Sequence, residues 1–144
     1  MKKLFIKLLS SDMKNPVYNF AILLFRIGIA AQLIVVHGLK KIGIGVTSVE
    51  VIPNPFGFPD TMNNFIAIMA NVYLPFFIII GLFTRAAALP AMMVTATGYF
   101  IVHANDVNTI KDIPYMYTIS LLTIIFLGSG KYSLDYYISK SLNV

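Results

Sequence analysis

The chain contains no cysteine and little charge, and both shortages narrow its chemistry. Without Cys among its 144 residues, the sequence excludes disulfides, thiolate metal sites and dithiol–disulfide exchange within the chain. It also excludes a haem or iron–sulfur cluster anchored by Cys. Charged residues make up 12% of the sequence and apolar residues 58%, which leaves too little charge to cover the surface of a soluble protein. The sequence therefore predicts an integral membrane protein.

The apolar residues are gathered in long blocks rather than in amphipathic stripes. Each block is near the length that crosses a bilayer as a helix, and none shows the two-residue alternation of a barrel strand. We therefore predict an all-α integral membrane four-helix bundle with up-down topology, forming one domain over residues 1–144. Short segments at the N-terminus and C-terminus are expected to lie at the interface. The predicted spans cover about residues 17–36, 65–83, 85–102 and 113–127.

Basic residues predict the orientation of these spans, because short cytoplasmic loops collect Lys and Arg. With the N-terminus inside, the inner side carries Lys2, Lys3, Lys7, Lys14, Arg85, Lys131 and Lys140, and the outer side carries Lys40, Lys41 and Lys111. This bias favours both termini in the cytoplasm. The net charge of +5 does not indicate nucleic acid, since the lysines flank apolar blocks and form no basic groove. The segment 1–14 lacks a signal-peptide pattern and is expected to lie flat on the inner surface, while 38–64 should form a loop over the outer end.

Arg26 lies near the centre of the first predicted span. A guanidinium there costs roughly 2.5–3.5 kcal/mol on insertion scales, so an intramembrane charge is a functional-site hypothesis by default. Residues eleven apart return to nearly the same helix face, which places His37 above Arg26 and Lys41 one turn beyond it. The spacing predicts one polar stripe that runs from Arg26 to the outer mouth.

Polar residues of the other spans fall in the same outer half of the membrane. Asn71 lies on the second span, and Pro75 four residues later should free its carbonyl from the helix ladder. His103 ends the third span, with Tyr99 behind it on one face, and Asp112 opens the fourth. We expect a cavity that opens outward and has Arg26 at its floor.

Each of these residues also has a structural interpretation. Arg26 could snorkel or bind backbone carbonyls; its counter-charge could be Asp112, the carbonyl of Asn71 or a bound anion. The histidines could be interfacial residues at helix ends, and Asn71 could bond a neighbouring helix. With no third strong ligand, two histidines make a poor zinc site, so no metal site is predicted.

Several short motifs occur in an order that resembles the DoxX family of small bacterial and archaeal membrane proteins. Each motif is weak alone, and their joint order over residues 17–137 carries the resemblance. They are Arg26, His37-Gly38-Leu39-x-Lys41, Gly81-Leu82-Phe83-Thr84-Arg85, Val102-His103 and Gly128-Ser129-Gly130-Lys131-Tyr132-Ser133-Leu134-Asp135.

The resemblance implies a prokaryotic inner-membrane subunit linked to redox chemistry. One branch of the family includes the membrane subunit of thiosulfate:quinone oxidoreductase, and other members are associated with oxidative-stress complexes that contain superoxide dismutase and a sulfurtransferase. The family's polar positions correspond to Arg26, His37, Arg85 and His103. Where members usually carry a Glu, this chain has Asn71, which removes a carboxylate that could pair with an arginine or carry protons.

We therefore expect a redox-linked subunit whose cavity holds a quinone or a small sulfur-containing anion. Arg26, His37, Asn71 and His103 are the predicted ligand-binding residues, with Lys41, Arg85, Tyr99 and Asp112 in support. The chain carries no redox group of its own that we identify, so any enzymatic role would be as a quinone-linked oxidoreductase subunit acting with a partner. Two alternatives remain: a protein that binds or passes small anions, and a membrane anchor for a peripheral partner. The sequence leaves the substrate and the oligomeric state open.

Overall fold

The protein is all-helical over the described residues, 15–142 of a computed structural model, and this range contains no strand. Four helices are long and apolar enough to cross a membrane: Pro16–Ile42, Asp60–Ile80, Thr84–Val102 and Asn108–Leu127. The predicted fold class is thereby confirmed. The segment 1–14, predicted to lie on the inner surface, is outside the described residues.

Three of the four spans are not uniform α-helices. The first comprises α2 (Pro16–Gln32), a π-helix η1 (Leu33–Gly38) and a 3₁₀ turn η2 (Leu39–Ile42). The second comprises α3 (Asp60–Ile68), the π-helix η3 (Met69–Tyr73) and α4 (Leu74–Ile80). The third comprises α5 (Thr84–Thr97) and the π-helix η4 (Gly98–Val102), and the fourth is α6 (Asn108–Leu127). A short α7 (Leu134–Ser141) follows.

The bounds of three spans differ from the prediction, and the second runs over Asp60–Ile80 rather than 65–83. The first helix continues past residue 36 to Ile42, and the fourth begins at Asn108 rather than at residue 113. The first apolar block ends before His37, and the fourth begins after Asp112. Helical backbone hydrogen bonding extends beyond both blocks, through polar residues that a helix end can carry into the interface. As a result Arg26 is not central. It lies ten residues from Pro16 (26 − 16) and sixteen from Ile42 (42 − 26).

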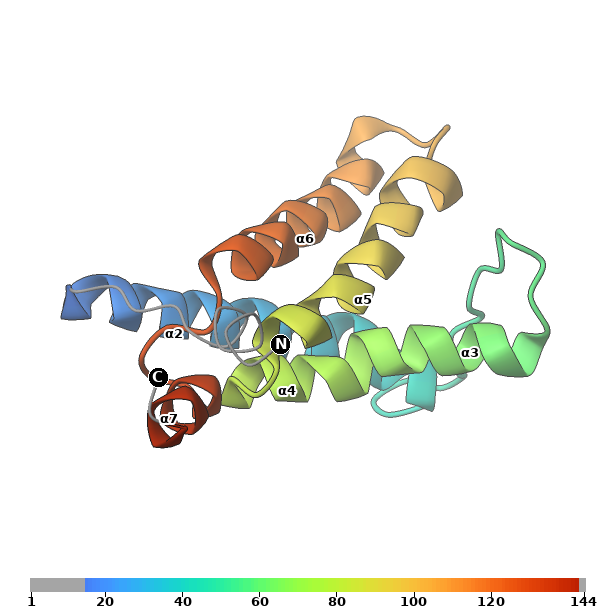
Figure 1. Cartoon of the computed structure of the whole chain (residues 1–144). Coiled ribbons are helices and arrows are strands. Elements are labelled where there is room, and N and C mark those ends of the chain that lie inside the picture. The colour runs from blue at the N-terminus through green and yellow to red at the C-terminus, as the bar shows by residue number, and fades with distance from the viewer. Residues whose placement is uncertain (1–14, 143–144) are drawn as a thin grey trace.

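The helices form two groups that are close at one end of the molecule and diverge at the other. α2 lies beside α4, and α5 pairs along its length with α6. Figure 1 shows the α5–α6 hairpin leaning away from α3, while α7 lies beside the end of α4. We call the end that carries segment 43–59 the loop end, and the end that carries residues 128–142 the tail end.

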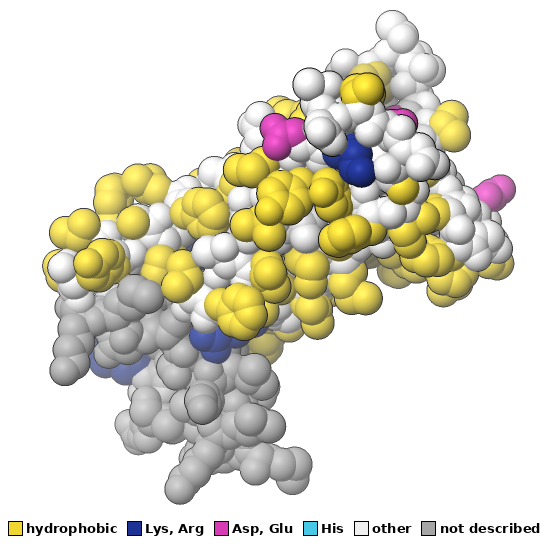
Figure 2. Space-filling view, turned by 90° about the horizontal axis from the view of Figure 1, so that it is seen from above, with side chains coloured by type: hydrophobic (Ala, Val, Ile, Leu, Met, Phe, Trp, Pro, Cys, Tyr) yellow, Lys and Arg dark blue, Asp and Glu magenta, His cyan; other side chains and the backbone are white. Residues whose placement is uncertain are grey.

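The core is built largely from small side chains. Ala30 of α2 and Ala87, Ala88 and Ala91 of α5 are buried, and they let the backbones approach closely, as is common between membrane helices. Larger buried residues complete the core: Leu33, Ile78, Leu121 and Ile124. Figure 2 shows hydrophobic side chains spread over the described part of this face with few charged ones among them, which suits contact with lipid.

Gly38 marks a close approach of the first and second spans. A Cβ atom placed on it would lie 2.5 Å from the carbonyl oxygen of Asn71 and 2.9 Å from Cγ2 of Val72. Backbone cannot yield as a flexible side chain can, so the contact requires glycine. Gly28, in the same helix, has nothing within 4 Å of its equivalent Cβ position.

We expect Gly38→Ala to destabilise the protein by about 1–3 kcal/mol, because the methyl group overpacks the contact with η3. Gly28→Ala is the matched control and should be neutral or slightly stabilising, since alanine favours a helix interior. The unfolding midpoints of both variants in one detergent, against the unaltered protein, check this. Equal shifts for the two variants would show that η1 and η3 do not touch closely at Gly38.

Candidate functional site

A cavity of about 600 Å³ lies at the loop end of the bundle. Its walls come from η1, α3, η3, α5, η4 and α6, and segment 43–59 contributes to it as well. This volume falls within the usual range of small-molecule sites. Most of the lining is apolar, with polar groups at a few positions, which is also typical of such sites.

All three π-helices border this cavity. η1 contributes Leu33 and His37, η3 contributes Asn71, and η4 contributes Gly98 and Val102. A π turn bonds N–H groups to carbonyls five residues back; the N–H of Leu39, for example, donates to the carbonyl of Ile34. Such turns are rare and occur often at functional sites. Their shared location supports the cavity as the candidate site.

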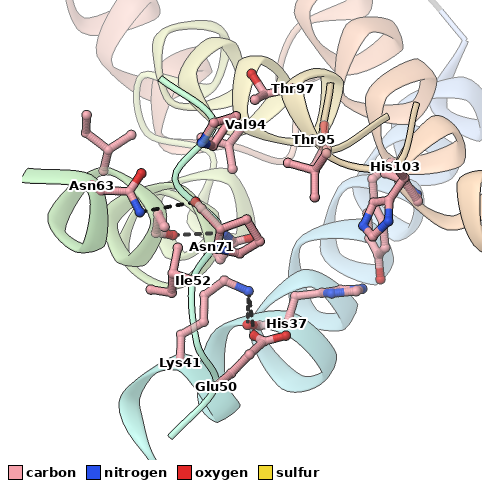
Figure 3. Close-up of a pocket in the computed structure, with 18 of the residues that line it drawn as sticks. His37, Lys41, Glu50, Ile52, Asn63, Asn71, Val94, Thr95, Thr97 and His103 are labelled. Atoms are coloured by element: carbon pink, nitrogen blue, oxygen red, sulfur yellow. Dashed lines mark hydrogen bonds and ion pairs between the residues drawn. The ribbon is translucent and has the colours of Figure 1, made fainter. Parts of the chain in front are cut away.

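His37 and Asn71 supply buried polar groups to the cavity (Figure 3). The Nε2 atom of His37 is buried and has no hydrogen-bond partner among the described residues. The imidazole packs edge-on against the ring of Tyr117, with centroids 5.2 Å apart. Asn71 is 5% exposed, and its Nδ2 donates to the carbonyl of Ala67 at 2.8 Å, so its amide bonds its own helix rather than a neighbouring one. Facing them across the cavity, Thr95 of α5 shares a hydrogen bond with Thr118 of α6.

Segment 43–59 is tied to the first helix by a charged cluster. The carboxylate of Glu50 pairs with Nζ of Lys40 at 2.8 Å and with Nζ of Lys41 at 2.9 Å. Lys41 also donates to the carbonyl of His37. Partial burial acts to raise the pKa of the Glu50 carboxyl, but the hydrogen bonds and positive charges of the two lysines outweigh it and hold the pKa below its ordinary value. At neutral pH these three residues together carry a formal charge of only +1 (2 − 1).

His103 also lines the cavity, at the end of the third span. Its Nδ1 lies 2.7 Å from a carboxylate oxygen of Asp106 in the turn that follows. The structure thus brings together three of the predicted ligand-binding residues, His37, Asn71 and His103, and the predicted supporting residue Lys41.

Arg26, the fourth predicted ligand-binding residue, does not line this cavity, so its expected place at the floor is wrong. It is 1% exposed and lies at the tail end, where Nη1 donates to the carbonyl of Ser129 at 2.7 Å and Nη2 to that of Tyr132 at 2.9 Å. The predicted stripe assumed an unbroken α-helix, but η1 intervenes and rotates His37 away from it. Of the alternatives open for Arg26, bonding to backbone carbonyls is the one observed.

The other supporting residues also lie outside the cavity. Arg85 is at the tail end, where its Nε donates to the carbonyl of Ile125 at 3.0 Å. Tyr99 packs against Tyr115 and Phe100, and Asp112 is exposed. Helical periodicity alone did not distinguish the cavity face of α5 and α6 from their outer faces.

Asp135 is a buried charged residue to which the sequence assigned no role. It is 2% exposed, and its carboxylate accepts hydrogen bonds from the N–H groups of Phe83 at 2.6 Å and Thr84 at 3.0 Å. These are N–H groups at the start of α5, which otherwise lack partners. Asp135 also attracts Arg26 electrostatically. Its position in the last of the quoted motifs was a signal that could have identified it.

Within the cavity, Glu50 and Tyr117 were also missed. Glu50 is an acidic residue of the segment 38–64, which was predicted only as a loop, and Tyr117 was not among the predicted site residues. No group of three or more His, Asp or Glu side chains in the described range could hold a metal ion.

Replacing Arg26 tests its structural role. We expect Arg26→Met to destabilise the protein by roughly 2–4 kcal/mol, because two buried carbonyls at the tail end lose their donor. Lys140→Met, an exposed change in α7, is the control and should have little effect. The unfolding midpoint and the rate of proteolysis after residue 127 check this. An unchanged midpoint would contradict the role.

The Glu50 cluster predicts a pH dependence. A lowered pKa means that the carboxylate stabilises the folded protein above the ordinary carboxyl pKa and loses this effect as pH falls through the lowered value. We expect Glu50→Gln to lower the unfolding midpoint at neutral pH, and the difference from the unaltered protein to vanish in acid. A difference that persists unchanged at low pH would contradict the assignment.

Comparison with known proteins agrees with the motifs. The DoxX family model matches residues 21–104, more than half of the chain. A protein of Haemophilus influenzae described only as uncharacterised is 32% identical over 93 residues, which cover 61% of this chain and 62% of that protein. The chain thus spans less than two thirds of that relative's length. No solved structure matches this chain. The matched segment includes both histidines of the cavity and Arg26, and the protein belongs to the DoxX family.

Proposed function

We propose that this membrane protein binds a quinone ring in the cavity at the loop end and serves as a subunit of a redox-linked complex. The observation that carries the proposal is that His37, a residue lining a largely apolar cavity, has a buried Nε2 without a hydrogen-bond partner among the described residues. A buried polar atom without a partner is costly, and a ligand oxygen would satisfy it. A quinone offers an apolar ring with two such oxygens.

The charges around the cavity favour a neutral ligand over an anion. Arg26 is at the other end of the bundle, where backbone carbonyls bind it. Lys40 and Lys41 are paired with Glu50. The cavity therefore holds little free positive charge, while its apolar walls suit a ring. This weakens the small-anion alternatives.

In quinone reduction, the residues of this chain would transfer protons rather than electrons. Reducing a quinone to a quinol takes two electrons and two protons, and an imidazole can exchange protons near neutral pH. His37 is the residue placed to do so, with Lys41 and Glu50 between it and the aqueous side. The electrons would come from a partner subunit, since the described side chains form no redox centre. The loop end would face outward, with both termini in the cytoplasm, as the distribution of Lys and Arg predicts. The family resemblance implies that the membrane is the inner membrane of a prokaryotic cell.

Quinone binding by the purified protein in nanodiscs tests the proposal. We expect His37→Phe, which keeps a ring but removes both nitrogens, to weaken the binding of a benzoquinone by about tenfold, the effect of losing one buried hydrogen bond. Tyr73→Phe, a polar change on an exposed ring outside the cavity, should leave binding unchanged. Absence of binding to the unaltered protein, or equal binding by both variants, would refute the proposal.

A further inference from the structure

The lining of the cavity reaches an exposed side chain at the middle of the third span. Its lining includes Met93, the central residue of the span Thr84–Val102, and this side chain is 59% exposed. Ile113 of α6 and Phe58 of segment 43–59 also line it, and they are 51% and 38% exposed. A residue that both lines the cavity and is exposed at mid-span marks an opening through the side of the bundle.

The helix arrangement accounts for this opening. α5 packs on α6, whereas α3 is held mainly through η3, so the two sides separate toward the loop end (Figure 1). Between them the wall consists of Ile66 and Ala67 from α3 and Met93 and Val94 from α5. These four side chains are apolar. Asn63 of α3 and Thr95 and Thr97 of α5 also line the cavity, while His37, Asn71 and the charged cluster of Glu50 with its two lysines come from other elements (Figure 3).

We propose that this opening is a lateral portal that holds the hydrocarbon tail of a lipophilic quinone whose ring occupies the inner cavity. The inference rests on the proposed function and specifies its substrate class. One cavity is lined both by His37, with its buried imidazole nitrogen, and by the exposed mid-span residue Met93. A hydrocarbon chain needs no hydrogen bonds, so it fits an exit through the bilayer core better than one past Lys40, Lys41 and Glu50. A water-soluble quinone would have no use for such an exit.

Blocking the portal tests the inference. The ligands are two benzoquinones with the same ring, one without a side chain and one with a decyl chain, and the protein is in nanodiscs. We expect Met93→Trp to weaken binding of the decyl compound by about tenfold or more, because an indole in the opening overpacks the tail. Binding of the compound without a chain should change by less than about twofold, since its ring does not reach the portal. Leu89→Trp is the matched control: Leu89 lies one turn away on α5, is 47% exposed and does not line the cavity.

The outcomes separate the two proposals. If the chainless ring binds and depends on His37, but Met93→Trp leaves the decyl compound unaffected or weakens both ligands equally, the portal is refuted and the ring site stands. If neither quinone binds the unaltered protein, the proposed function fails and the portal with it.

A labelling experiment avoids any effect of Met93→Trp on folding. A quinone with a photoreactive group at the end of its tail is irradiated with the unaltered protein, and the labelled peptides are identified. We expect labels on α3 and α5 near Ile66 and Met93, reduced by excess decyl compound. Labels confined to residues 43–59 would place the tail at the aqueous end and overturn the inference, as would labels near Met93 that the decyl compound does not reduce.

Discussion

The buried guanidinium of Arg26 is the constraint on which the arrangement of the helices depends. A charge that is 1% exposed is tolerated only where hydrogen-bond acceptors converge on it, and here they are the carbonyls of Ser129 and Tyr132. The chain after α6 must therefore fold back onto α2. That turn also places Asp135, whose carboxylate binds the first N–H groups of α5. One buried charge thus fixes the connection of α6, α2 and α5 at the tail end.

This use of Arg26 leaves the loop end with the cluster of Lys40, Lys41 and Glu50, whose opposite charges largely offset one another. There the helices diverge, and three of the four spans form a π turn at the level of the cavity. Each π turn departs from the regular α-helical ladder, and one of them carries His37, whose buried Nε2 has no partner among the described residues. Close packing at one end and open packing at the other divide the bundle into a structural half and a candidate binding half.

The family motifs divide in the same way. Arg26, Arg85 and Asp135 act on backbone groups at the tail end, whereas His37, Lys41 and His103 belong to the cavity. Loss of activity on replacing Arg26 would therefore not identify a ligand-binding residue, since the connection after α6 would be lost first. The histidines are better probes of function, because they contribute to the cavity without holding the helices together.

Composition and the spacing of apolar blocks determined that the chain is a membrane bundle of four helices, because the bilayer sets the length and polarity of a span. The same pattern placed His37, Asn71 and His103 at one end. It could not place Arg26, because its partners are carbonyls about a hundred residues away, and a carbonyl has no signature in the sequence. Nor could it foresee the π turns that rotate His37 off the expected stripe. Tertiary packing decided both, since backbone acceptors and helix register become specific only when the helices meet.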